Sequence, residues 1–320
     1  MTILVTGGLG FVGSHFVWDA IAEGRRVVVL DDGDPREGAA MPAGVEVVHG
    51  DIGDRDAVLR VVRGAGVRAV VHFAGKIQVG ESVVKPRLYF DVNVGRSLVL
   101  LDALLDAGVE ELVFSSSAAV YGVPDVVPTP EDAPALPINP YGFSKLAIER
   151  ALEAYERAYG LRWAALRYFN AAGAHPSGEL RERHDPETHL VPLAIDAALG
   201  RRPPLALFGV DYPTADGTCI RDYVHVSDLA AAHLRALELL ATRSLGAINL
   251  GAGRGASVRE VLSTVGEVAG APVPVVVAPR RAGDPAALVA DPARALAVLG
   301  FAPKRADLRV MVEDTLRSRR

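Results

Sequence analysis

The stretch TILVTGGLGFVG, residues 2–13, decides the fold of this chain. Thr2–Thr6 is a short apolar run, typical of a strand buried in a parallel sheet. After it the glycines recur as G-x-x-G-x-x-G, at Gly7, Gly10 and Gly13, and SHFVWDAIAEG follows with helical periodicity. A glycine loop between a strand and a helix aims backbone amides at a phosphate group and lets the backbone approach it closely. A tight strand–helix turn without a ligand is the alternative interpretation.

The strands that follow also end in acidic or small residues. RVVVL, residues 26–30, ends at Asp31, where a carboxylate can accept the ribose hydroxyls of a dinucleotide and would repel a 2′-phosphate. VEVVHGDI is a third strand ending at Asp51-Ile52, and RAVVHFAG is a fourth ending at Ala74-Gly75. Ligands of open α/β sheets lie at the carboxyl ends of the strands. The pattern therefore predicts a Rossmann-type doubly wound parallel sheet that binds NAD rather than NADP.

Tyr141 and Lys145 lie in NPYGFSK, residues 139–145, where Pro140 suits the first turn of a helix. They fall one turn apart on one helix face. A tyrosine base at neutral pH needs its pKa lowered by about 3 units, roughly 4 kcal/mol. One ammonium at about 4 Å supplies ~1 kcal/mol in water and ~4 kcal/mol at an effective dielectric of 20. Lys145 would suffice only in a shielded site, and an oxidised nicotinamide ring would add a second positive charge. An exposed Tyr and Lys on a surface helix are the alternative.

Two further polar features point to the same edge of the sheet. The predicted strand ELVFSSS ends in three serines, and a serine there could relay a proton to Tyr141; serines that satisfy loop backbone groups are the alternative. Asn93 lies inside a long predicted helix, residues 81–108, although Asn is a poor helix former. A polar role inside the protein and a harmless exposed position are both open for Asn93.

Composition excludes several classes of function. The net charge of -5 argues against a nucleic-acid surface. One cysteine, Cys219, excludes an internal disulfide framework and a Cys-rich zinc site, and the eight histidines lack metal-ligand spacing, so no metal is expected. The N-terminus is too short and uncharged for a secretory signal, and no apolar run could span a membrane. We expect a soluble cytoplasmic protein.

Taken in order, TGGLGFVGSH, Asp31, HFAGKIQVGES, FSSSAAVYG and PYGFSK resemble an extended short-chain dehydrogenase/reductase. RYFNAAGAHPSGE, LALFGVDYPTADGTCIRDYVHVSDLA, INLGAG and APRRAGDP resemble specifically the UDP-glucose/UDP-galactose 4-epimerase family. The resemblance runs from Thr2 to beyond Ala290, and the second group of motifs is the discriminating one.

The resemblance implies a role for each matching residue. Tyr141 would be the catalytic base and acid, Lys145 its partner, and Ser117 a hydrogen-bond partner of the reacting hydroxyl. The NAD contacts implied are Gly7, Gly10, Phe11, Val12, Gly13, Asp31, Asp51, Ile52, Phe73, Ala74, Gly75, Lys76, Asn93, Ser115, Tyr141, Lys145 and Phe169. The contacts implied for a UDP-sugar are Ser117, Tyr141, Asn170, His189, Leu190, Ala206, Leu207, Phe208, Arg221, Arg281, Asp284 and Leu288.

Four positions leave alternatives open. The family often carries a lysine one place after Lys76. At Leu288 the family has a bulky tyrosine in enzymes narrow for unacetylated sugars and a smaller residue in those that accept N-acetyl groups, and leucine is intermediate. Arg221 and Arg281 suit diphosphate oxygens because guanidinium groups form paired hydrogen bonds, but surface ion pairs with Asp222 or Asp284 are the alternative.

The function predicted is reversible C4 epimerisation of a UDP-hexose through a 4-keto sugar on tightly bound NAD. A 4,6-dehydratase needs an extra acid and base beside the serine, where this chain has Ala118 and Ala119. A 4-epimerase of UDP-N-acetylhexosamines or UDP-pentoses, and a non-catalytic NAD-binding protein, are the remaining alternatives.

We expect residues 1–170 and 222–250 to form the NAD-binding domain, and residues 171–221 and 251–320 to form the nucleotide-sugar lobe. The resemblance also implies a homodimer through helices near residues 86–107 and 140–159. Leu98, Leu101 and Leu105 would permit it, and burial in the core explains them equally well.

Overall fold

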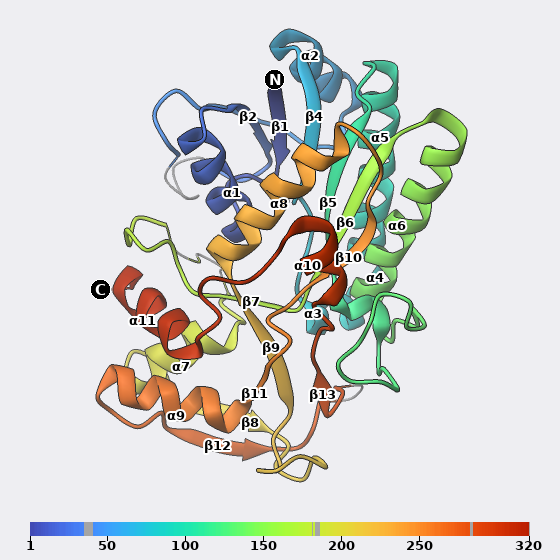
Figure 1. The fold of residues 1–320 in the computed structure, drawn as a ribbon. Helices are drawn as coiled ribbons and strands as arrows, with labels where there is room; N and C mark the ends of the chain where they lie inside the picture. The colour runs from blue at the N-terminus through green and yellow to red at the C-terminus, as the bar shows by residue number, and fades with distance from the viewer. Residues whose placement is uncertain (35–40, 181, 183–185, 282–283, 320) are drawn as a thin grey trace.

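The structure is a computed structural model that describes residues 1–34, 41–180, 182, 186–281 and 284–319. Its centre is a parallel sheet of seven strands (Figure 1). In spatial order these strands are β3 (Glu46–His49), β2 (Arg26–Asp31), β1 (Thr2–Thr6), β4 (Val67–His72), β5 (Glu111–Ser117), β6 (Arg162–Tyr168) and β10 (Gly246–Leu250). This is the doubly wound α/β fold that the sequence predicts, because helices cover both faces.

Alternation along β1 assigns its side chains to two cores, since successive residues of a strand point to opposite faces. Ile3 and Val5 pack with helices α1 (Phe11–Ala22), α8 (Val226–Leu240) and α10 (Ala293–Leu299). Leu4 packs on the other face with α2 (Arg55–Ala65), α5 (Arg96–Asp106) and α6 (Pro140–Tyr159). Helices therefore cover both faces of the sheet, so a ligand can approach at its carboxyl edge.

A smaller lobe follows β6 and lies below the sheet in Figure 1. Its strands are β7 (Asn170–Ala172), β9 (Ile220–His225), β11 (Gly255–Ser257) and β13 (Ala287–Leu288), with β8 (Leu205–Phe208) and β12 (Val275–Ala278) as a separate pair. Its helices are α7 (Leu190–Ala198), α9 (Val258–Ala269) and α11 (Leu308–Ser318), which share a third core. Although α10 falls in the range predicted for this lobe, its Ala295 and Leu299 pack in the first core instead.

The long helix predicted over residues 81–108 is wrong, because the segment is broken. It consists of α3 (Val79–Val84), α4 (Pro86–Tyr89), a π-helical turn η1 (Phe90–Gly95) and α5. Pro86 explains the first break, since a proline disfavours helical geometry in the residue before it and donates no N–H. Within α5, Leu101 is buried in the core, whereas Leu98 is only partly buried, so core packing accounts for Leu101.

Two strand ends also differ from the predictions. The third strand ends at His49 and the fourth at His72, so Asp51-Ile52 and Ala74-Gly75 lie in the turns after them. The N-cap of α8 is His225, whose ring accepts a hydrogen bond from the Ser227 amide. The Asp228 carboxylate accepts hydrogen bonds from two backbone amides near residue 304, which fastens the chain after α10 to α8.

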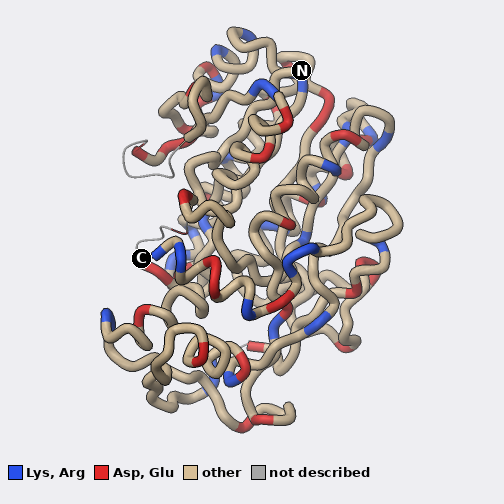
Figure 2. Tube along the Cα trace, turned by 60° about the vertical axis from the view of Figure 1, so that its left-hand side comes forward, with Lys and Arg blue, Asp and Glu red and all other residues tan. Residues whose placement is uncertain are grey.

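Charged residues of both signs are interspersed along the trace (Figure 2). Among the described residues, no helix is long and apolar enough to cross a membrane.

Candidate active site

The start of α6 presents Tyr141 and Lys145 toward the carboxyl end of β5. Asn139 caps this helix by accepting the Gly142 amide at 2.9 Å, and Pro140 occupies its first turn. Tyr141 is 8% exposed and Lys145 3%, so they are not an exposed surface pair. The Lys145 Nζ atom lies 5.8 Å from the centre of the Tyr141 ring.

The electrostatics of Tyr141 differ from the sequence expectation. Burial raises the pKa of Tyr141 above its usual value, and a hydrogen bond with the Ser117 hydroxyl opposes this rise. Lys145 does not offset the burial, since its Nζ donates to the Ser115 carbonyl oxygen at 2.8 Å. The protein without a second positive charge therefore keeps the phenol protonated at neutral pH.

The pKa of Lys145 also departs from its usual value. Burial lowers the pKa of Lys145 to about 8, and the attraction of Glu149 opposes that fall. The ammonium also lies over the Phe114 ring, 4.9 Å from its centre, which favours the charged form.

The three serines that end β5 have three different partners. The Ser115 hydroxyl bonds with the Tyr168 hydroxyl, the Ser116 hydroxyl donates to Glu149 at 2.6 Å, and the Ser117 hydroxyl bonds with Tyr141. Ser117 also caps the following 3-10 turn η2 (Ala118–Tyr121), because its hydroxyl accepts the Ala119 amide. Ser117 is thus the serine that shares the reacting end of the site.

Two tyrosines that the sequence analysis does not single out lie beside Tyr141. Tyr89 is fully buried and meets Tyr141 edge-on, with ring centres 6.5 Å apart. Burial raises the pKa of Tyr168, and the charge of a Tyr141 phenolate would raise it further. Tyr89 carries no motif signal, because it falls inside an apolar pattern that a core position explains equally well. Tyr168 lies in the RYFN motif, in which the resemblance implies roles only for Phe169 and Asn170.

The glycine loop is shaped by close backbone contacts. Gly7 has φ +72, and a Cβ there would lie 2.5 Å from the Ala74 backbone nitrogen. A Cβ on Gly13 would lie 2.2 Å from the Gly7 carbonyl oxygen. Gly10 precedes α1, and a Cβ there would meet only the Gly7 oxygen at 3.3 Å. Gly7 and Gly13 therefore allow the backbone to pack closely, whereas Gly10 keeps space open in front of the helix.

Asp31 fastens this loop. Its carboxylate accepts one hydrogen bond from the Leu9 amide of the glycine loop, at 2.9 Å, and another from the Gly33 amide, at 2.9 Å. Asp31 therefore also has a structural role in the turn that follows β2. Burial raises the pKa of the Asp31 carboxyl, and the two amide hydrogen bonds oppose the rise.

The ends of β3 and β4 bring further predicted residues to the same edge. Asp51 accepts the Gly53 amide at 2.7 Å and pairs with Arg96, while the Ile52 side chain is buried in the core. Asn93 is 3% exposed and not a surface residue. Its side chain accepts the Lys76 amide at 2.8 Å and donates to the Lys76 carbonyl oxygen and the Ser144 hydroxyl. Asn93 thereby ties the loop at Phe73–Lys76 to α6, one residue before Lys145.

On the opposite side, the predicted substrate residues lie on β7, β8, β9 and the chain before β13. Arg221 pairs with Asp284, and the Arg281 guanidinium stacks on the Phe208 ring, 4.1 Å from its centre. Ala206 is exposed, whereas Leu207 is buried with its side chain on the other face of β8, so only its backbone could reach a ligand there.

Phe169, Asn170 and Leu288 connect this side to the catalytic face. Phe169 and Leu288 are both half-buried against the cluster formed by Ala118, Val120 and Tyr121. Asn170 is the first residue of β7 and is half-buried. Leu288 therefore lies beside the η2 segment that directly follows Ser117.

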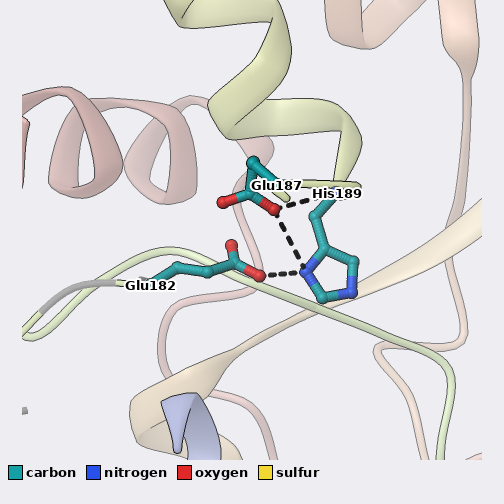
Figure 3. A group of neighbouring side chains, drawn as sticks. All are labelled: Glu182, Glu187 and His189. Atoms are coloured by element: carbon teal, nitrogen blue, oxygen red, sulfur yellow. Dashed lines mark hydrogen bonds and ion pairs between the residues drawn. The ribbon is translucent and has the colours of Figure 1, made fainter. Parts of the chain in front are cut away.

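His189 and Leu190 lie at the start of α7, and Figure 3 shows a contact that the sequence analysis did not predict. The His189 ring bonds with Glu182, and its Nδ1 lies 3.9 Å from a Glu187 oxygen. Donor atoms of these three residues lie within 4.8 Å of one another, a set that could also hold a cation. Contacts among the three side chains alone account for the same arrangement. The sequence spacing of Glu187 and His189 alone does not indicate this group, because the third member, Glu182, must also be brought to it.

Comparison with known proteins agrees with this geometry. Residues 3–251 match the NAD dependent epimerase/dehydratase family. A UDP-glucose 4-epimerase of Azospirillum brasilense is 52% identical over 98% of this chain and 90% of its own length, and one of Corynebacterium glutamicum is 47% identical over 98% and 94%. The chain belongs to the UDP-glucose 4-epimerase family.

Solved structures of this family have the same fold. The UDP-glucose 4-epimerase of Brucella ovis in complex with NAD has a TM-score of 0.93 and 46% identity, covering 98% of this chain and 97% of its own. The enzyme of Bifidobacterium longum in complex with NAD+ and UDP has a TM-score of 0.95 and 36% identity, covering 100% and 98%. The resemblance read from the sequence motifs is confirmed.

Proposed function

We propose that this protein is an NAD-dependent enzyme that reversibly epimerises the C4 carbon of a UDP-hexose, interconverting UDP-glucose and UDP-galactose. The observation that carries the proposal is the buried set of Tyr141, Ser117 and Lys145 at the carboxyl end of the parallel sheet. The relatives support it, since near full-length UDP-glucose 4-epimerases include one in complex with NAD+ and UDP.

The residues at the sheet edge fit NAD. Gly10 leaves the space in front of α1 open, and its position has no side chain to cap the helix, so the N-terminal end of α1 faces a place where a pyrophosphate suits it. Asp31 is half-buried at the end of β2, where its carboxylate can accept ribose hydroxyls and repels a 2′-phosphate. Asp51, the Phe73–Lys76 loop and Asn93 would hold the rest of the cofactor along the same edge.

NAD, when bound, supplies the acceptor and then the donor of the C4 hydride, by way of a 4-keto sugar, and adds positive charge near Tyr141. Tyr141 holds the proton of the sugar 4-hydroxyl and returns it, acting as general base and then general acid. Ser117 would hydrogen-bond the sugar 4-oxygen. Its hydrogen bond with Tyr141 also opposes the rise in the phenol pKa that burial causes. Lys145, buried one helical turn beyond Tyr141, would contact the nicotinamide ribose, as the family resemblance implies.

Arg221 and Arg281 are placed to anchor the diphosphate while the sugar changes the face it presents. Both lie on the substrate side, and guanidinium groups match phosphate oxygens with paired hydrogen bonds. Binding at Arg221 must compete with its ion pair to Asp284, a pair that is only partly exposed at 12% and 24%. We propose that the diphosphate takes the place of Asp284 at this guanidinium.

Ala118 and Ala119 argue against a 4,6-dehydratase. That reaction removes a C5 proton and protonates a leaving hydroxyl, which needs an acid and a base next to Ser117. Ala118 is 2% exposed in η2 and neither alanine can transfer a proton. Hydrolysis or reduction of the substrate is also disfavoured, because both need a further reactant that epimerisation does not.

An epimerisation assay without added NAD tests the proposal. We expect turnover of UDP-galactose to UDP-glucose, because the cofactor is regenerated in each cycle and can stay bound. Tyr141→Phe should lower kcat by about 10³-fold while NAD remains bound, since general acid–base transfer is worth about 10²–10⁴. If UDP-galactose fails to turn over even with NAD supplied, the substrate assignment is wrong. Parallel turnover of UDP-N-acetylgalactosamine would show that Leu288 leaves room for the N-acetyl group.

Three finer statements also remain proposals. We propose a homodimer through the helices at residues 86–107 and 140–159, where Leu98 and Leu105 remain partly exposed. We propose a cytoplasmic location. We also propose that residues 1–170 and 222–250 act as the NAD-binding domain and the other ranges as the nucleotide-sugar lobe, except that α10 packs with the first and β9 belongs to the sheet of the second.

A further inference from the structure

Glu149 continues the helix face that carries the catalytic pair. Tyr141, Lys145 and Glu149 are spaced four residues apart on α6, so they lie one above the other. Their exposed fractions are 8%, 3% and 2%, and this face of α6 packs against β5. Glu149 is thus a buried carboxylate one turn beyond a buried ammonium.

The three side chains meet three successive residues of β5. The contacts are Tyr141 with the Ser117 hydroxyl, Lys145 with the Ser115 carbonyl oxygen at 2.8 Å, and Glu149 with the Ser116 hydroxyl at 2.6 Å. Each contact specifies the same register of α6 along β5. A rotation or slide of the helix would break all three together.

Arg167 on β6 holds Glu149 in this register. Its Nε donates to one Glu149 oxygen at 2.9 Å and its Nη2 to the other at 2.6 Å, which is the paired geometry that a guanidinium forms with a carboxylate. Arg167 also donates to the Tyr121 hydroxyl at 2.9 Å, and Tyr121 donates to Asn249 on β10 at 2.7 Å. The network therefore joins β5, β6, β10, η2 and α6 behind the catalytic residues.

A need for stability does not explain this network. Removing two charges from water costs several kcal/mol per ion, and well-packed apolar residues often serve stability equally well or better. The best attested use of a buried polar pair is to specify one register among several. Here the register concerned is that of the helix carrying Tyr141 and Lys145.

We propose that Glu149, held by Arg167, is a positioning residue for the reaction, fixing α6 on β5 so that Tyr141 meets Ser117 and keeping the Lys145 ammonium charged. The turnover readout rests on the proposed function, whereas the charge of Lys145 can be measured without any substrate.

Glu149 is the acidic group among those that act on Lys145. The groups that contact Lys145 or act on its charge are Tyr141 and Glu149 on α6, His72 on β4, and the Phe114 ring and the Ser115 carbonyl on β5. On β6, Arg167 pairs with Glu149, and Tyr168 bonds with the Ser115 hydroxyl. Burial lowers the pKa of His72 to about 3, so His72 is uncharged at neutral pH. Burial lowers the pKa of Lys145 to about 8 against the attraction of Glu149. Loss of the Glu149 charge should lower that pKa further.

The test compares Glu149→Gln with Glu153→Gln, a change one turn further along α6 at a side chain paired with exposed Arg150. The chain has four lysines, Lys76, Lys85, Lys145 and Lys304, so ¹³Cε-lysine labelling of the NAD-containing protein gives four signals. Lys145 is assigned by the signal that Lys145→Met removes. In Glu149→Gln we expect its titration midpoint to fall by about one pH unit, as for the loss of an opposite charge within ~6 Å. In Glu153→Gln we expect no change.

Turnover supplies the second readout. We expect Glu149→Gln to lower kcat for UDP-galactose by about tenfold or more at pH 8, since a shift of about 1 Å in a catalytic group can cost 10²-fold. KM should change little, because Glu149 lies behind the catalytic residues. The alkaline fall in activity should move to lower pH.

A paired variant separates positioning from folding. Glu149→Gln leaves Arg167 without its anion, so it is matched with Glu149→Leu/Arg167→Met, which removes both charges and retains apolar volume. If the pair only stabilises the fold, this double variant recovers wild-type kcat, and the proposal is overturned. If it positions the catalytic pair, the double variant unfolds cooperatively but keeps the low kcat. An unchanged Lys145 titration in Glu149→Gln also overturns it, even if wild-type protein fails to turn over UDP-galactose.

Discussion

The two sides of the candidate site are built differently. On the cofactor side the backbone makes the shape: Gly7 and Gly13 pack at distances that no side chain permits, and the Asp31 carboxylate holds the loop through two amides. On the substrate side long charged side chains make the shape, and Arg221 is already paired with Asp284. The first surface is complete within the fold, whereas the second must exchange partners when it binds an anion.

This difference has a physical consequence. A backbone-built surface loses its shape when a single atom is added, because the neighbouring backbone cannot move away. A surface of partly exposed charged side chains loses one interaction when one residue changes, and the rest can rearrange in solvent. Substitutions on the two sides should therefore differ in kind as well as in size.

Gly7→Ala should have the largest effect. The added Cβ would lie 2.5 Å from the Ala74 nitrogen at a residue with φ +72. We expect a loss of stability of at least about 2 kcal/mol, since Ala is strained at positive φ and must also displace backbone. We also expect loss of retained NAD, measured by absorbance after denaturation and by turnover with and without added NAD.

Gly24→Ala is the matched control for this change. Gly24 follows α1 with φ +73, and a Cβ there meets nothing within 4 Å. It should cost about 1–2 kcal/mol from backbone strain alone and leave NAD bound. Equal effects of the two substitutions would show that backbone strain, and not the close approach of the two chain segments, accounts for the glycine.

The same difference explains what could be predicted from the sequence. Glycine spacing, the acidic residue after the second strand and the Tyr141–Lys145 pair are local patterns, and each implies its geometry through short-range backbone rules. They suffice to predict the parallel sheet and the cofactor edge. The break at Pro86 was also readable, because proline disfavours a helical residue before it, but the strong apolar period around it favoured one helix.

Contacts between distant segments could not be read in this way. Nothing local joins Glu149 to Arg167, or Glu182 to His189, because those pairs form only when separate elements pack together. The raised pKa of Tyr141 could not be predicted either, since it comes from burial, which is a property of the folded surroundings. Sequence reasoning named the ionisable groups, whereas the fold decides which of them pair.

Arg221→Leu should have an intermediate effect. Loss of charge-assisted hydrogen bonds to a diphosphate is worth about 1.5–3 kcal/mol, so kcat/KM should fall by about 10–100-fold, mainly through KM. NAD should remain bound, because Arg221 lies on the substrate side. Steady-state kinetics with UDP-galactose measure the change.

Arg280→Leu is the control in the same lobe, since Arg280 forms an exposed ion pair with Asp211 at 2.7 Å. It should change KM by less than about twofold, as exposed ion pairs contribute ~1 kcal/mol or less. If Arg221→Leu left KM unchanged as well, Arg221 would serve only its pair with Asp284, the alternative that the sequence left open.

The smallest effect is expected beneath the cofactor side, at His233 on α8. Its ring is fully buried and packs at a tilt against the Phe73 ring, with centres 4.7 Å apart. Its Nδ1 lies 2.8 Å from the Leu229 carbonyl oxygen. The other ring nitrogen has no hydrogen-bond partner within the described part of the chain. Burial lowers the pKa of His233 to about 4 from a usual value of 6.5.

The direction of the pH effect follows from this shift. Between pH 6.5 and 4 the unfolded chain binds a proton at this histidine and the folded protein does not, so folding becomes less favourable as the pH falls. From pH 7 to pH 5 this one group should remove about 2 kcal/mol of stability. The His233→Leu variant should not lose this part of its stability between pH 7 and pH 5. A His49→Leu variant, changed at an exposed residue of β3, should lose it as the wild type does. Urea unfolding at the two pH values measures the difference. If His233→Leu loses as much stability in acid as the wild type, other buried histidines such as His72 dominate, and the core beneath Phe73 is not where acid first weakens the cofactor side.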